Sequence, residues 1–153
     1  MEVGDFVFAG NLAFTTLWQA IEKGAILEEV QSQSERFAAF AIQSHNGPVH
    51  ETIRIEQQFV ASLRGKSTET LKLNGGAFDE AACFGAITQA NFGCGIAFYH
   101  IIKTMLAFLD GRYTDALNAA HEAEAMLRAA MALPIEATFH FFHALALTAL
   151  FPE

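Results

Sequence analysis

The sequence is poor in charged side chains and in cysteine. Only 17% of its 153 residues are Asp, Glu, Lys or Arg, against an average of about 25% in soluble proteins. The nine Lys and Arg residues stand singly, and the formal net charge is −8. Because nucleic-acid binding needs clustered basic side chains, we expect no nucleic-acid partner. Cys83 and Cys94 lie in apolar or glycine-containing surroundings and are predicted to be buried thiols.

The sequence also lacks a continuous apolar run that predicts a membrane span. Residues 81–102 are uncharged, but polar and glycine residues in the stretch 89–95 interrupt them and predict a turn. A second run, 137–151, is shorter and stops at Pro152. No basic stretch precedes an apolar core near the first residue, so we expect no secretory signal and a cytoplasmic protein. The apolar content of 52% then predicts faces that neighbouring segments cover.

Helical periodicity runs through nearly the whole chain. Apolar residues recur at intervals of three and four, and no alternating β-type pattern competes with them. The predicted helices span residues 6–23, 26–43, 48–64, 80–87, 96–109, 113–132 and 135–150, with Asp79 as an N-cap and a turn at Gly93-Cys94-Gly95. The fold class is therefore all-α, a single domain over 1–153. It divides into a first helix group at 1–65, an exposed, mobile loop at 66–78 and a second helix group at 79–153.

Two helix–glycine–helix stretches indicate an internal repeat. The second resembles the G-x-Y-x-x-A core of a tetratricopeptide repeat, and Gly24 marks a degenerate first copy; the positions are Gly24, Gly111, Tyr113, Ala116, Ala120 and Ala123. Glycine permits the left-handed turn, the aromatic ring fills the hairpin, and small alanines let two helices approach closely. The pattern predicts antiparallel helix hairpins in a TPR-like α-solenoid fragment of about six to seven helices. An ordinary helical bundle with a glycine turn is the alternative.

A longer series of short motifs carries a second resemblance. In chain order they are Gly4-Asp5, Ile26-Leu27-Glu28-Glu29-Val30, Arg36-Phe37, Leu63-Arg64-Gly65, Phe78-Asp79-Glu80-Ala81, the stretch 105–113 and the stretch 139–147. Their order and spacing resemble the helical region of very large bacterial multi-domain sensor kinases. In that family a serine/threonine-kinase-like domain and an AAA-type ATPase precede the helical repeats, and GAF and histidine-kinase domains follow. The resemblance covers nearly the whole chain and implies a connector between the ATPase and the sensor and kinase modules.

No residue pattern predicts catalysis. The chain has neither a phosphate-binding P-loop nor a kinase catalytic pattern. His121 stands beside an acid on a helix, but the basic residue and proline typical of a phosphoacceptor site do not follow it. His140 and His143 could face one metal, yet two ligands do not make a site, and aromatic neighbours favour packed histidines. Neither cysteine has the electropositive setting of a nucleophile. We therefore expect no enzyme activity, no cofactor and no metal.

The aromatic excess, with 15 phenylalanines, predicts an interaction face. In the repeat register the concave surface carries Phe14, Trp18, Ile21, Phe98, Ile101, Met105 and Phe108. These side chains either bind a protein partner, pack against neighbouring repeats or the core, or line a small-molecule cavity. The leading hypothesis is a non-catalytic scaffold of a signalling protein, whose partners are other proteins or neighbouring domains and which self-associates when isolated. The alternative is a small-molecule sensor in which Trp18, phenylalanines and the paired histidines enclose a ligand.

Overall fold

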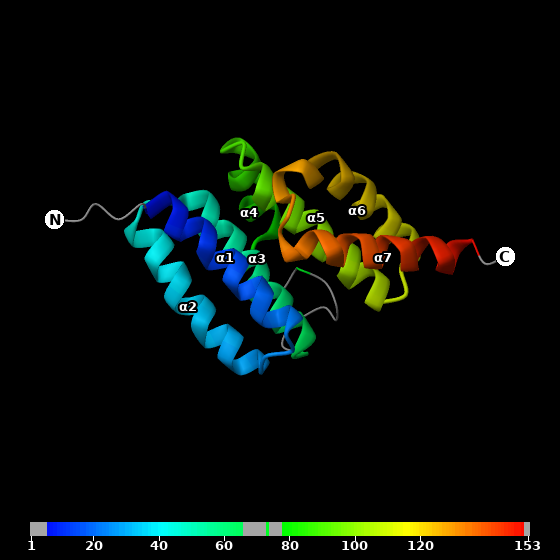
Figure 1. The fold of residues 1–153 in the computed structure, drawn as a ribbon, viewed down its shortest axis with the longest axis horizontal. Coiled ribbons are helices and arrows are strands. Elements are labelled where there is room, and N and C mark those ends of the chain that lie inside the picture. Colours follow the sequence, from blue (N-terminus) through cyan, green and yellow to red (C-terminus); the bar gives the residue numbers. More distant parts are fainter. Residues whose placement is uncertain (1–5, 66–72, 74–77, 152–153) are drawn as a thin grey trace.

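The computed structural model describes residues 6–65, 73 and 78–151 of the chain, and nearly all of these lie in helices. In chain order the elements are α1 (Phe6–Glu22), α2 (Leu27–Gln43), α3 (Gly47–Leu63), α4 (Glu80–Gln89), α5 (Gly93–Leu109), α6 (Tyr113–Met126), the 3-10 helix η1 (Leu127–Ala130) and α7 (Pro134–Leu150) (Figure 1). The predicted all-α class is confirmed, and the described α-helices agree in number with the expected six to seven.

Local residue chemistry sets several helix ends. Gly24 and Gly111 both have a φ of 73°, the left-handed conformation that glycine adopts without a steric penalty after a helix. The side chain of Asn46 accepts a hydrogen bond from a backbone N–H in the first turn of α3. Asp79 does the same for α4 over 2.9 Å. The two glycine turns and the Asp79 cap are therefore confirmed.

The predicted turn at Gly93-Cys94-Gly95 is wrong, because these residues form the first turn of α5. The chain turns just before them, where Asn91 takes a left-handed φ of 53° that asparagine tolerates. Glycine is needed inside the helix at position 95 for a different reason. A Cβ atom there would lie 2.6 Å from Oγ1 of Thr52, so the glycine allows α5 to approach α3 closely.

The helix predicted over 113–132 is also shorter than expected. The α-helical part, α6, ends at Met126, and η1 continues it only as far as Ala130. Ala132 then takes a left-handed φ of 66°, and its N–H donates to the Glu136 carboxylate in the first turn of α7 over 2.8 Å. This contact stabilises the turn that leads into α7.

The helices form an inner and an outer layer. In the inner layer α1, α3, α5 and α7 contact one another in that order, and α7 also contacts α1, which closes a ring. In the outer layer α2, α4 and α6 each pack on the two odd-numbered helices that flank them in the chain. Figure 1 shows α1–α3 and α5–α7 as two groups side by side. The pairing order is that of stacked helix hairpins, but the closure of α7 on α1 was not predicted.

Large side chains from the odd-numbered helices fill the centre of the ring. All but one of the largest fully buried residues come from these helices; the set is Trp18, Phe14, Phe59, Phe98, Phe139, Leu17, Ile53, Ile55, Ile87, Ile101, Ile102 and Leu106. The ring of Phe98 lies 5.0 Å from that of Phe14 and 5.9 Å from that of Trp18. Because these contacts join α1 directly to α5, the aromatic centre holds the two helix groups together.

A polar contact completes the closure between α1 and α7. The Glu22 carboxylate accepts a hydrogen bond from the indole N–H of Trp18 over 2.7 Å and another from the Thr138 hydroxyl of α7. The buried indole is thereby satisfied, and the same carboxylate connects the first helix to the last.

The predicted alanine stripe forms the close interface of α6. Ala116, Ala120 and Ala123 are all 0% exposed. Ala116 clusters with small residues of both α5 and α7, whereas Ala120 and Ala123 belong to the main core. The ring of Tyr113 lies 5.4 Å from that of Phe108, beside the turn that connects α5 to α6. Small side chains therefore allow α6 to lie close against α5.

Most of the predicted loop 66–78 lies outside the described residues. Only Leu73 and Phe78 are described there, and Leu73 is buried in the core cluster at 3% exposure. Phe78 is half-buried, with the guanidinium of Arg54 5.3 Å above its ring. The prediction of an exposed loop is therefore wrong at these two residues, because both side chains find apolar or cationic neighbours.

We expect Ala120→Leu to destabilise the fold by about 1–3 kcal/mol, because a larger side chain at a fully buried position forces α6 away from α5. Ala125→Leu is the matched control, since Ala125 is exposed on the same helix. Chemical denaturation of the two variants measures the difference. Equal free energies of unfolding would contradict the close packing of this interface.

Candidate functional site

The predicted interaction face is not accessible in this structure. Phe14, Trp18, Phe98, Ile101 and Met105 are buried, and the remaining two members, Ile21 and Phe108, are half-buried. Of the three alternatives given for these residues, packing in the core agrees with their burial, whereas an accessible partner-binding face does not. The odd-numbered helices close on themselves, so their concave side is filled by its own aromatic side chains and forms the core.

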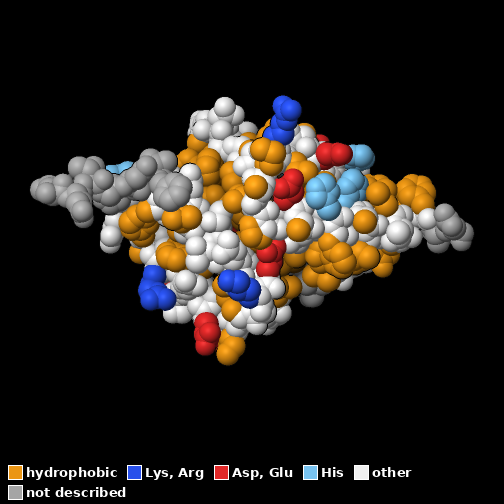
Figure 2. All heavy atoms as spheres, viewed as in Figure 1, with side chains coloured by type: hydrophobic (Ala, Val, Ile, Leu, Met, Phe, Trp, Pro, Cys, Tyr) orange, Lys and Arg blue, Asp and Glu red, His pale blue; other side chains and the backbone are white. Residues whose placement is uncertain are grey.

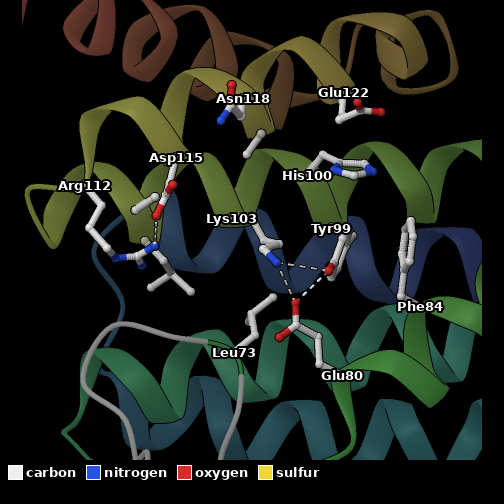
Figure 3. Close-up of a pocket in the computed structure, with 13 residues that line it drawn as sticks. Leu73, Glu80, Phe84, Tyr99, His100, Lys103, Arg112, Asp115, Asn118 and Glu122 are labelled. Atoms are coloured by element: carbon white, nitrogen blue, oxygen red, sulfur yellow. Dashed lines mark hydrogen bonds and ion pairs between the residues drawn. The ribbon is translucent and has the colours of Figure 1, made fainter. Parts of the chain in front are cut away.

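A groove of about 480 Å³ lies instead on the outer face of α5, between α4 and α6 (Figure 3). Its lining comes from these three helices and the segments beside them: Leu73, Glu80, Phe84, Tyr99, His100, Lys103, Leu106, Ala107, Arg112, Asp115, Asn118, Ala119 and Glu122. The groove exists because α4 has 10 residues where α2 has 17. A helix as long as α2 would cover more of α5.

One end of the groove is aromatic. The rings of Phe84 and Tyr99 are stacked with their centroids 4.1 Å apart, and His100 meets each of them edge-on at 5.3 and 4.9 Å. Figure 3 shows Glu122 of α6 beyond His100 at this end. The three rings provide a flat apolar surface with polar atoms at its margins, which suits a planar or apolar ligand group.

A partly exposed ionic network holds α4 against α5 at the centre of the groove. The Lys103 ammonium donates to Glu80 over 2.8 Å and to the Tyr99 hydroxyl over 3.2 Å. The Tyr99 hydroxyl also donates to the same Glu80 oxygen over 2.6 Å. The ammonium lies 5.2 Å from the Tyr99 ring centroid, so it adds a cation–π contact. This network fixes the positions of the side chains that a ligand would meet.

The other end of the groove is ionic and more exposed. Arg112 donates to Asp110 over 2.6 Å and to Asp115 over 2.9 Å. Both positive groups of the groove, Lys103 and Arg112, are thus paired with carboxylates of the same chain. A ligand that needs a free cation would have to displace one of these pairs.

Two groups in the groove have shifted pKa values. Burial lowers the pKa of His100 from its usual value of 6.5, with nearby Glu122 opposing the shift and Lys103 adding to it. Burial also raises the pKa of Tyr99, and the hydrogen bond to Glu80 and the charge of Glu80 raise it further. His100 is therefore neutral and Tyr99 protonated near neutral pH, so both can donate or accept hydrogen bonds without carrying charge.

The other histidines singled out in the sequence lie elsewhere. His140 is exposed and His143 half-buried, and their ring centroids lie 5.1 and 5.3 Å from that of Phe139. His121 faces His143 at 6.4 Å. Among the described residues, no three His, Cys, Asp or Glu side chains are grouped so that they could hold a metal ion. The paired histidines pack on an aromatic ring and do not line the groove.

The two thiols are poorly suited to nucleophilic chemistry. Burial raises the pKa of Cys94 to about 11, and the charge of Glu56 contributes. Burial and a hydrogen bond to Glu51 raise the pKa of Cys83, which is fully buried. Both thiols are free, as predicted. Within the part of the chain that the structure describes, no helix is long and apolar enough to cross a bilayer.

The groove was missed by the sequence analysis, although the sequence contains a signal for it. Tyr99, His100 and Lys103 are polar residues in a mostly apolar helix, and Tyr99 and Lys103 are spaced by one turn. On α6 the polar residues Asp115, Asn118 and Glu122 recur at three and four. Together these spacings mark the uncovered sides of two adjacent helices.

Comparisons with known proteins give no further guidance, because no family model, curated protein or solved structure matches the chain. The resemblance to the helical region of sensor kinases stays a prediction.

We expect Glu80→Gln to lower the pKa of Tyr99, because the substitution removes the negative charge that disfavours a tyrosinate beside it. Ultraviolet titration in a Tyr113→Phe background isolates Tyr99, since the chain has two tyrosines. Asp115→Asn, at the ionic end of the groove, is the control and leaves the Tyr99 pKa unchanged. An unaltered pKa in Glu80→Gln would show that the network of Glu80, Tyr99 and Lys103 does not form.

Proposed function

We propose that this chain is a non-catalytic, cytoplasmic helical scaffold that joins parts of a signalling protein through helix packing. The observation that carries the proposal is the outer face of α7. Among the described helices, α3 and α5 each contact two even-numbered helices, whereas α7 contacts only one, α6, and keeps one face exposed. The exposed residues of α7 and its C-cap are mostly apolar, with His140 and Thr148 as the polar members: Ala137, His140, Phe141, Ala144, Leu147, Thr148, Ala149 and Phe151.

The exposure of these residues of α7 is large for apolar side chains. Phe141 is 61% exposed, Leu147 39% and Phe151 70%. Figure 2 shows apolar side chains gathered over α7. Apart from Glu136, Thr138, His140, His143 and Thr148, every residue of α7 is apolar, so most of the surface of this helix is apolar. A helix of this kind is normally buried.

The occupant that fits the face is a further amphipathic helix. It would pack on α7 as α6 packs on α5, and so continue the alternation of odd- and even-numbered helices. In the parent protein a neighbouring helical segment would supply it. In the isolated chain a second copy would supply it, which predicts self-association. This role agrees with the connector function that the resemblance to sensor kinases implies.

We expect the isolated chain to associate at micromolar concentrations and Phe141→Glu to shift it to the monomer, because a charge cannot be buried in an apolar contact. Sedimentation velocity over a concentration series measures this, with circular dichroism to check that the variant is folded. Met131→Glu is the matched control, since Met131 is 70% exposed but lies before α7. A wild-type monomer at all concentrations, or equal effects of both variants, would count against the proposal.

A second function, small-molecule sensing, is favoured by the groove on α5. Its volume of about 480 Å³ is within the roughly 300–1,000 Å³ typical of ligand pockets. It combines a stacked aromatic surface with polar groups whose positions are fixed by the network of Glu80, Tyr99 and Lys103. The ligand site of this alternative therefore differs from the predicted one, in which Trp18 and the paired histidines enclosed the ligand.

We expect a groove ligand to raise the melting temperature of the chain, because binding to the folded state alone stabilises it, by about 2.7 kcal/mol at a hundredfold excess over Kd. Ala119→Phe places a ring in the groove and abolishes the shift. Ala125→Phe, exposed on the same helix, retains it. A thermal-shift screen of metabolites in which no compound acts, or in which Ala119→Phe responds like the wild type, would remove this function.

A further inference from the structure

A carboxylic acid without a partner lies in the core where the two helix groups meet. Glu56 of α3 is 1% exposed, and neither carboxylate oxygen has a hydrogen-bond partner. Buried polar groups are nearly always hydrogen-bonded, and an unpaired buried charge costs several kcal/mol. This residue is therefore an exception in the core that has no role in the groove or on α7.

The neighbours of Glu56 place it at the contact between α3 and α5. One turn before it, Thr52 lies so close to Gly95 of α5 that a Cβ atom on that glycine would be 2.6 Å from the threonine hydroxyl. Less than one turn after it, the ring of Phe59 lies 5.6 Å from that of Trp18 in α1. The carboxyl thus sits between the contact of α3 with α5 and the contact of α3 with α1.

Among the described residues, no charged group forms an ion pair or a hydrogen bond with Glu56. From α5 the titratable group within its electrostatic range is the Cys94 thiol, whose own pKa Glu56 raises. The acid of α1, Glu22, is bound to Trp18 and Thr138. In α4, α3 and α2, ion pairs form between Glu80 and Lys103, Glu51 and Arg54, and Glu28 and Arg64. The other charged residues of α2, Glu29, Glu35 and Arg36, are exposed.

We propose that the closed contact between α3 and α5 requires a neutral Glu56 carboxyl, and that ionisation of this carboxyl loosens the junction between the two helix groups. Water can reach the charge only if α3 and α5 separate. Separation would also loosen the contacts of Phe98 with Phe14 and Trp18, which cross the same junction. Glu56 is thus a pH-sensitive group that controls this contact, and the proposal does not depend on the scaffold or ligand-binding functions.

The sign of the pH effect follows from the direction of the shift. Burial raises the pKa of Glu56 well above its usual value of 4.5. The folded state therefore holds this proton more tightly than the unfolded state does. Stability from this group is complete below about pH 4.5 and is lost as the pH rises through the raised pKa, by up to about tenfold in the folding equilibrium per pH unit.

The test compares the wild type with Glu56→Gln across pH, using chemical denaturation and the emission of the single tryptophan. Gln has nearly the shape of the protonated acid but cannot ionise. We expect equal stability at low pH, a stability advantage of Glu56→Gln that grows with pH, and a red shift of Trp18 emission with rising pH in the wild type alone. Glu35→Gln, an exposed acid of α2, follows the wild type.

Glu56→Met serves as a second variant, because it keeps the length of the side chain without an ionisable group. If ionisation of Glu56 loosens the contact between α3 and α5, the stability of Glu56→Met has the same pH profile as that of Glu56→Gln. A stability difference between the wild type and both variants that does not change with pH would overturn the proposal. So would a wild-type Trp18 emission that stays constant over the range in which the stability changes.

Discussion

Four helices have to share one apolar interior, and most other features of the molecule follow from this constraint. The rings of Phe14, Trp18, Phe59 and Phe98 meet at the centre, although they come from α1, α3 and α5, which are distant in the sequence. In this arrangement α7 lies against α1, and Glu22 accepts hydrogen bonds from both helices. The ring uses up the concave surface that an open solenoid would offer to a partner. The proposed scaffold function would therefore have to use the outer surface of the molecule.

The helices and the glycine turns were predictable because they depend on local sequence. Gly24, Gly111 and the alanines of α6 act through backbone conformation and side-chain size, which neighbouring residues alone reveal. The interaction face was not predictable, because burial of Phe14 and Phe98 depends on which distant helices meet. The same holds for the groove, which exists only because α4 is short. The polar residues of α5 were visible in the sequence, but only the fold shows that no helix of the described residues covers them.

The core and the outer layer carry different kinds of polar group. In the groove, Glu80, Tyr99 and Lys103 form hydrogen bonds with one another, so the two opposite charges are paired and held in fixed positions. In the core, the carboxyl oxygens of Glu56 have no hydrogen-bond partner among the described residues, so this side chain tolerates burial only as the neutral acid. The first arrangement makes a firm surface for recognition. The second makes the junction of the two helix groups sensitive to pH, since ionisation of Glu56 would place an unpaired charge in the contact between α3 and α5.

The separation of the even-numbered helices from one another has an evolutionary consequence. Within the described part of the chain α2, α4 and α6 contact only odd-numbered helices or η1. Each can therefore be shortened, lengthened or given new side chains without a matching change in the other two. The 10 residues of α4 beside the 17 of α2 show that the inner ring tolerates such variation. A protein built in this way can acquire a new surface at one position of the outer layer while its interior remains under the same selection.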